Sequence, residues 1–188
     1  MCGRFVQTPI RDAASLGFPQ LVGDLLSMPA SYNLAPTQRA AVVLDWGDGL
    51  QLERLAWGLL PFWAKAKKLQ GSTINARIET VATKPAFRSA FKKYRCLIPM
   101  AGYYEWSVNA EDGKKDPWFI HAAGPLWAAG LWEDTSPYST RTTSAPSRCG
   151  WRPAKAEGWM KADVDAAMAT LLVSEQPPPW TRSMSTGR

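Results

Sequence analysis

Three long apolar and aromatic segments in the middle of the chain restrict the fold most. They span Arg95 to Ser107, Pro117 to Ala122 and Leu126 to Trp132, and their composition is typical of strands. The polar stretch from Asn109 to Asp116 between the first two indicates a hairpin loop. Strands that a hairpin joins pair antiparallel, so we expect an antiparallel sheet at the centre of the fold.

Two further strands precede these segments. Residues Ala40 to Trp46 and Leu52 to Leu60 are strand candidates, and Asp48-Gly49 between them indicates a tight hairpin turn. The stretch from Tyr32 to Thr37 is predicted to be an extended loop, because Pro36 holds the residue before it out of the helical region.

Helices are expected to be few and short. One is predicted within Arg11 to Leu26, and a second begins at Lys84-Pro85 with Thr83 as its cap. A chain of 188 residues suits one domain. The predicted fold class is therefore α+β, a single domain with an antiparallel sheet or barrel core and flanking short helices.

Charge and aromatic content favour a nucleic-acid partner. The net charge is +6, and the chain contains 10 tryptophans. Aromatic rings interleaved with lysine and arginine suit single-stranded DNA, because bases stack on the rings while the cations contact phosphates. The alternative is that most of these rings fill the core, as large aromatic side chains commonly do.

Composition also argues against several classes of protein. No apolar run is long enough to cross a membrane, and no signal peptide is evident, so we expect a cytoplasmic protein. Three cysteines without a CxxC motif and the single histidine, His121, give no zinc-ligand spacing. We therefore expect no zinc site and no disulfide framework, and we expect Cys96 to fill the core.

Cys2 is the first candidate for chemistry. Its small side chain permits removal of Met1, which leaves an α-amine and a thiol on adjacent carbons. Such an aminothiol condenses with an aldehyde to an imine and then closes through sulfur to a thiazolidine. Both groups react at neutral pH, because their ordinary pKa values are about 8 and about 8.5. Taken alone, a Met-Cys start also arises by chance.

The segment Asn75-Ala76-Arg77-Ile78-Glu79-Thr80 is the second candidate. On a strand, Asn75, Arg77 and Glu79 share one face, opposite Ala76 and Ile78. An arginine fork suits phosphate, and an asparagine amide can orient an amine or a sugar oxygen. The alternative is an ordinary solvated strand face.

Glu105 within Tyr103-Tyr104-Glu105-Trp106 is the third candidate. A carboxylate that aromatic residues flank in an apolar strand is poorly solvated, which suits general acid–base work. The alternative is a buried glutamate that pairs with an arginine.

Together these segments resemble the SRAP family, the abasic-site processing proteins that include the bacterial SOS-response-associated peptidases. The resemblance covers roughly the first 133 residues. In chain order the matching segments are MCGRF at 1–5, YNLAPTQ at 32–38, WGLLPFWA at 57–64, INARIET at 74–80, FKKYRCLIPMAGYYEW at 91–106 and FIHAAGPLWAAGLWE at 119–133.

The resemblance implies a function in DNA damage and the SOS response. Members bind single-stranded DNA that holds an abasic site, and they form a covalent thiazolidine through an N-terminal cysteine that autocatalytic loss of the initiator methionine exposes. It thus implies an enzyme with self-processing peptidase and abasic-site crosslinking activity, needing no cofactor. It also implies a nucleoid-associated monomer whose partner is abasic single-stranded DNA.

Residue roles follow from the same resemblance. Cys2 is the implied nucleophile, Asn75 positions the amine and the sugar, and Glu105 assists proton transfers and the release of Met1. Arg77 is implied to contact a phosphate. The residues implied to line the DNA channel are Gly3, Arg4, Asn33, Trp57 and Trp63.

The chain departs from the family pattern after Glu133. The family carries a catalytic histidine in a segment like IHxRMP, whereas the only histidine here is His121. We therefore expect slow or absent reversal of the crosslink. We interpret 1–133 as the SRAP-like domain, incomplete at its C-terminal end, and 134–188 as a divergent tail of low order that a frameshift shortly after Glu133 explains. Two alternative functions stay open: a non-catalytic single-stranded DNA-binding remnant and a thiol-dependent peptidase.

Overall fold

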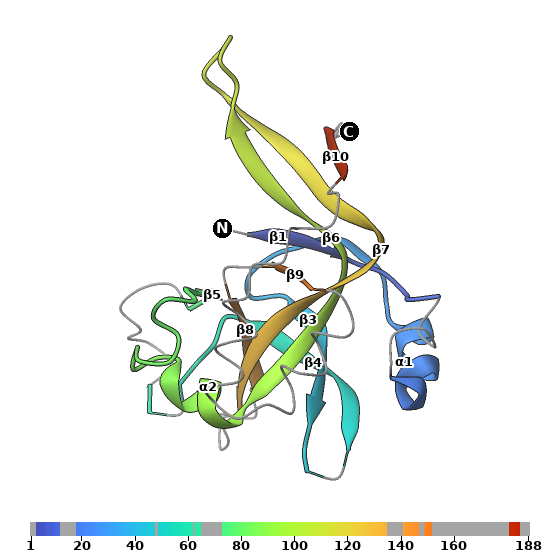
Figure 1. The fold of residues 1–188 in the computed structure, drawn as a ribbon, viewed down its shortest axis with the longest axis vertical. Helices are drawn as coiled ribbons and strands as arrows, with labels where there is room; N and C mark the ends of the chain where they lie inside the picture. The colour runs from blue at the N-terminus through green and yellow to red at the C-terminus, as the bar shows by residue number, and fades with distance from the viewer. Residues whose placement is uncertain are drawn as a thin grey trace.

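Two long paired strands organise the structure. The computed structural model describes residues 3–11, 18–47, 49–61, 63–64, 73–134, 141–146, 149–151 and 181–184. Strands β6 (Arg95–Val108) and β7 (Lys115–Asp134) pair antiparallel over almost their whole length. Figure 1 shows their hairpin extending beyond the rest of the molecule. The two strands predicted at 117–122 and 126–132 are parts of the single strand β7.

The other strands extend the sheet from this hairpin. Their order is β10-β7-β8-β4-β3-β6-β1-β2, with β5 beside β8 and β9 beside β7. The pairs are antiparallel except those of β8 with β4 and with β5. The bounds are β1 Arg4–Gln7, β2 Ser31–Leu34, β3 Arg39–Asp45, β4 Leu50–Trp57, β5 Asn75–Ala76, β8 Arg141–Pro146, β9 Cys149–Trp151 and β10 Thr181–Met184.

Short helices flank the sheet. They are a 3-10 turn at Pro19–Leu21, α1 at Val22–Ser27 and α2 at Arg88–Lys93. The mostly antiparallel sheet curls into a half-barrel beside these helices (Figure 1), which confirms the predicted α+β class. No helix in the described part of the chain is long and apolar enough to span a membrane.

Apolar residues pack on both faces of the sheet. The first core lies under the helices and includes Leu25, Phe87 and Phe91. The second core lies inside the curl and includes Phe5 and Trp57. Cys96, Leu97 and Ile98 of β6 alternate between the two cores, as the pleat of a strand requires. The sheet is therefore fixed from both sides, which accounts for the nearly continuous apolar runs in its central strands.

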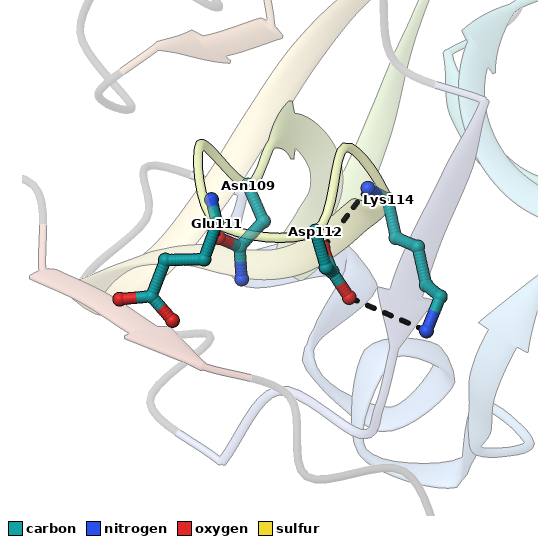
Figure 2. Close-up of polar contacts among 4 residues, drawn as sticks. All are labelled: Asn109, Glu111, Asp112 and Lys114. Atoms are coloured by element: carbon teal, nitrogen blue, oxygen red, sulfur yellow. Dashed lines mark hydrogen bonds and ion pairs between the residues drawn. The ribbon is translucent and has the colours of Figure 1, made fainter.

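The tip of the β6–β7 hairpin is held by short-range polar contacts (Figure 2). Asn109 Oδ1 accepts a hydrogen bond from the Glu111 amide at 2.9 Å, and Asp112 Oδ1 accepts one from the Lys114 amide at 3.0 Å. An ion pair of 3.3 Å joins Lys114 Nζ to Asp112 Oδ2. Gly113 supplies the positive φ of 69° that the turn needs.

A buried glutamine joins β1 to the two strands beneath it. The Gln7 amide nitrogen donates to the carbonyls of Ala41 and Pro99, each at 2.8 Å, and its oxygen accepts from the Ala41 amide at 2.8 Å. Strand β3 pairs with β6 at Val43↔Leu97, and the same register would bring Ala41 opposite Pro99. Proline has no amide hydrogen to donate across that pair. The Gln7 side chain thus supplies the hydrogen bond that Pro99 cannot.

Glu133 is the other buried polar or charged side chain among the described residues, with 2% of its surface exposed. Burial raises its pKa from 4.5 to about 7, because the charged form loses its hydration. The folded state therefore keeps a proton on Glu133 at pH values where the unfolded chain has lost it.

Three local predictions were wrong. Residues Tyr32 to Leu34 belong to strand β2 rather than a loop, because they pair with β1. The helix predicted from Lys84 begins at Arg88, after a turn in which the Phe87 amide bonds the Lys84 carbonyl at 2.9 Å. Asn75, Arg77 and Glu79 do not share a strand face, since β5 ends at Ala76.

Most of the tail at 134–188 lies outside the described residues. Within it the structure describes β8, β9 and β10, each of which pairs with β7. The boundary at Glu133, the frameshift and the low order of the tail stay predictions.

Replacing Gln7 with leucine is expected to lower the free energy of unfolding by about 3–5 kcal/mol, because it leaves three buried backbone groups without their partner. Chemical denaturation monitored by tryptophan fluorescence measures this change. The matched control is Gln20→Leu at an exposed position, where we expect a change within about 0.5 kcal/mol. Equal effects of the two substitutions would contradict the role of Gln7.

Replacing Glu133 with glutamine is expected to change the pH dependence of stability. Wild-type stability falls as pH rises from 4.5 to about 7, since the folded state then holds the extra proton. The free energy of unfolding of the variant relative to wild type should therefore rise by about 2–3 kcal/mol between pH 5 and pH 8. Urea unfolding at both pH values measures the difference, and parallel profiles would refute the prediction.

Candidate functional site

The N-terminal end of β1 leads to the base of the β6–β7 hairpin (Figure 1). Strand β1 pairs with β6 through Arg4↔Tyr104 and Phe5↔Tyr103. Continuing this register by one residue places Gly3 opposite Glu105. Cys2 lies outside the described residues. Glu105, the candidate general acid–base residue, is therefore level with Gly3. Gly3 directly follows Cys2, the candidate nucleophile, in the chain.

A close strand contact fixes the position of this part of β6. Gly102 pairs with His121 where the β6–β7 register shifts. A Cβ atom on Gly102 would lie 2.5 Å from the Phe119 ring and 2.6 Å from the Ile120 carbonyl oxygen. Only glycine allows this approach without displacing the backbone. The shift sets which face of the hairpin presents Glu105.

Asn75 is tied to β1 through a buried tryptophan. The Trp57 ring packs edge-on against Phe5, with 5.1 Å between the ring centroids. Its indole nitrogen donates a hydrogen bond of 2.7 Å to the carbonyl of Ile74, the residue before Asn75. Asn75 itself is half-buried, and its Oδ1 atom has almost no exposed surface. Trp57 thus links β1 to Asn75, because it contacts Phe5 on β1 and bonds the residue before Asn75.

Strand β1 divides the predicted site into two groups. Phe5 and Tyr103 pack into the second core, so alternation places Gly3 and Glu105 on that inner face. Arg4 lies on the opposite, outer face, where its Nη1 atom donates a hydrogen bond of 3.0 Å to Asn33 Oδ1. The site therefore has an inner face that carries the candidate acid–base residue and an outer face that carries a cation.

The outer face also carries a row of aromatic rings that the sequence reasoning missed. Tyr104 lies 5.3 Å from Phe119 between ring centroids, and Phe119 stacks on His121 at 5.2 Å. The Tyr104 hydroxyl donates to the Tyr32 carbonyl at 3.1 Å and so ties β6 to β2. We call the rings of Tyr104, Phe119 and His121 the outer aromatic row. The sequence could have indicated it, because side chains alternate along a strand and Tyr104 directly precedes Glu105. Rings beside a guanidinium suit stacked bases and a phosphate chain.

The remaining predicted residues lie in different surroundings. Trp57 is only 3% exposed, so it has no open ring face on which a base could stack. Trp63 is 52% exposed. Arg77 is exposed and follows β5 in a turn, where its carbonyl accepts from the Thr80 amide at 3.1 Å. In the described residues, histidine, cysteine and carboxylate side chains do not gather in any group that could hold a metal ion.

Comparison with known families identifies the chain's relatives. The family model described as SOS response associated peptidase (SRAP) matches residues 1–149. The chain belongs to the SRAP family. That match takes in every predicted site residue, from Cys2 to Glu105.

Curated relatives agree with this membership, and a solved structure shares the fold. The chain is 34% identical over 158 residues to the abasic site processing protein YoaM of Bacillus subtilis, covering 83% of this chain and 67% of that protein. It is 32% identical over 137 residues to the abasic site processing protein YedK of Escherichia coli, covering 70% and 59%. A phage-related protein from Bordetella bronchiseptica shares the fold, with a TM-score of 0.79 and 22% identity over 99% of this chain and 95% of that chain.

Replacing Trp57 with phenylalanine is expected to loosen β5 while it keeps most of the packing against Phe5. The substitution removes the hydrogen bond to Ile74, so amide hydrogen exchange at Asn75 and Ala76 should become faster. Trp63→Phe is the matched control, because Trp63 is exposed. Unchanged exchange in Trp57→Phe, or equal acceleration in both variants, would contradict the positioning role of Trp57.

Proposed function

We propose that this SRAP protein captures abasic sites in single-stranded DNA through a covalent bond to Cys2. The observation that carries the proposal is the β1–β6 register, which brings Gly3 level with Glu105 at the end of the chain where Cys2 lies. Family membership and relatives named abasic site processing proteins support the same substrate. The chain's net charge of +6 favours a polyanion.

Capture begins with hydrolysis of the Met1–Cys2 peptide bond by water, which frees the α-amine of Cys2. This amine attacks the aldehyde of the ring-opened abasic sugar, and loss of water gives an imine. The thiol then adds across the C=N bond, so that sulfur bonds to carbon and the thiol proton passes to nitrogen. The condensation of Cys2 with the aldehyde releases one water, and the product is a thiazolidine.

Glu105 and Asn75 serve these steps from the inner face. The Glu105 carboxyl group transfers protons as the carbinolamine loses water and as Met1 is released. The Asn75 amide orients the amine and the sugar, held in place through Trp57 and Ile74. Neither step calls for a metal or a cofactor.

DNA binding uses both faces of β1. We assign the phosphate chain to Arg4 and Asn33 on the outer face, with bases stacked along the outer aromatic row. The single-stranded DNA then turns around the N-terminal end of β1, which brings the abasic sugar to the inner face. Gly3 allows the backbone to approach the sugar there, since no described residue beyond its chain neighbours lies within 4 Å of the position its Cβ would take. Trp63 and Arg77 contribute from the segments after β4 and β5.

Release of the DNA is proposed to be slow. The only histidine of the chain, His121, stacks on Phe119 in the outer aromatic row and pairs with Gly102. Glu105 faces the other way, so His121 is not a partner for it in opening the thiazolidine. The protein then acts as a long-lived cap on the lesion in the DNA-damage response, at the nucleoid.

The test is incubation of purified wild type and Cys2→Ala with an abasic single-stranded oligonucleotide, followed by denaturing electrophoresis. We expect a heat-stable adduct for wild type and its loss in Cys2→Ala, which has no thiol to close the ring. Cys2→Ala and Cys2→Ser both keep the α-amine, so an imine adduct of either variant should survive denaturation only after borohydride reduction.

Two outcomes would overturn the proposal. Salt-sensitive binding without any adduct in wild type indicates a non-catalytic DNA-binding remnant. Cleavage of other proteins that depends on Cys2, without an adduct, indicates a thiol-dependent peptidase. A chase with excess unlabelled abasic DNA measures release, and rapid exchange would contradict the slow reversal.

A further inference from the structure

A pocket of about 650 Å³ opens at the end of the sheet remote from β1. The end of β3, helix α2 and the end of β7 form it. The register that pairs Arg95 with Leu131 places the pocket beside the start of β6, whereas Glu105 lies ten positions further along the same strand. That separation corresponds to roughly 30 Å of extended chain. The pocket is therefore separate from the DNA site.

Aromatic rings form one wall of the pocket. Trp132 packs edge-on against Trp46 with 4.7 Å between the ring centroids, and Tyr94 lies 4.9 Å from Trp132. The Trp132 amide donates a hydrogen bond of 2.8 Å to the Tyr94 carbonyl, which fixes two of the rings relative to each other. Their π-faces carry partial negative charge, which attracts cations.

Carboxylates dominate the charge of the pocket. Asp45, Glu133 and Asp134 line it, and Lys93 is the basic residue on its wall. Only 2% of the Glu133 surface is exposed, and this burial raises the pKa of its carboxyl group to about 7. A buried carboxylate is costly unless an opposite charge compensates it, so a cationic ligand that contacts Glu133 is favoured.

The residues that line the pocket indicate which class of ligand it can bind. The acidic residues Asp45, Glu133 and Asp134 outnumber Lys93 on the walls, so the pocket does not favour a DNA phosphate. The carboxylates do not come together as the ligands of one metal ion would, among the residues that the structure describes. Aromatic faces beside carboxylates suit an alkylammonium group, whose methylenes pack on the rings while its charge meets the acids. The volume lies in the range of small-molecule pockets, which is about 300–1,000 Å³.

We propose that this pocket binds a small aliphatic polyamine, with one ammonium group against Glu133 and its chain against Trp46 and Trp132. The site is independent of the abasic-site chemistry at β1. Binding of the cation favours the charged carboxylate of Glu133. Because burial raises the pKa of Glu133 to about 7 in the empty pocket, binding near pH 6 releases a proton.

Isothermal titration calorimetry with spermidine on the full chain tests this. We expect one site whose affinity rises about tenfold between pH 6 and pH 8, as Glu133 loses its proton. Glu133→Gln should weaken binding at pH 8 by at least about tenfold and remove the pH dependence. Trp46→Leu, which removes an aromatic wall but no charge, should weaken binding by about three- to tenfold.

The matched control is Glu111→Gln, which makes the same chemical change at the exposed hairpin tip. Figure 2 shows that the Glu111 side chain extends away from the Asp112–Lys114 ion pair. This variant should bind spermidine like wild type. Equal binding by all variants, no binding up to millimolar spermidine, or equal affinity for Mg²⁺ would overturn the proposal. Cooperative urea unfolding of each variant establishes that it is folded.

Discussion

The three hydrogen bonds of the Gln7 side chain hold strands β1, β3 and β6 together beside the proposed site. Strands β3 and β6 would pair directly at Ala41 and Pro99 if proline could donate, and the Gln7 amide completes the polar pairing there. Because Gln7 lies on β1, the same contacts fix β1 over the second core. The position of β1 therefore depends on this buried amide as well as on the pairing of β1 with β2 and β6.

Side chains of β1 contact residues on both faces of the proposed site, so the position of β1 affects both faces. Phe5 contacts Trp57, and Trp57 bonds the residue before Asn75, so Asn75 is linked to β1 through two contacts. Arg4 contacts Asn33 on the outer face, beside the rings of Tyr104 and Phe119. A covalent enzyme needs its nucleophile held close to its acid–base group. In the proposed mechanism, the pairing of β1 with β6 brings Gly3, the residue after Cys2, level with Glu105.

The fold class could be predicted from the sequence because it follows from local patterns, whereas the roles of the site residues stay predictions. The apolar runs of β6 and β7 and the polar hairpin between them predicted an antiparallel sheet. Faces were harder to predict, because they depend on register: the shift at Gly102 decides which side of β6 presents Glu105. The Gln7 contacts were not predictable, since they join residues far apart in the chain. The role of Glu133 was missed for the same reason, because its burial arises from packing between β3, α2 and β7.

The most direct test of the account is the identity of the crosslinked atoms. Tryptic digestion of the adduct with abasic single-stranded DNA, followed by mass spectrometry, locates the sugar on one peptide. We predict that it lies on residues 2–4 without Met1, with neither a free thiol nor a free α-amine on Cys2. A sugar attached to a lysine, or to a peptide that retains Met1, would contradict the mechanism.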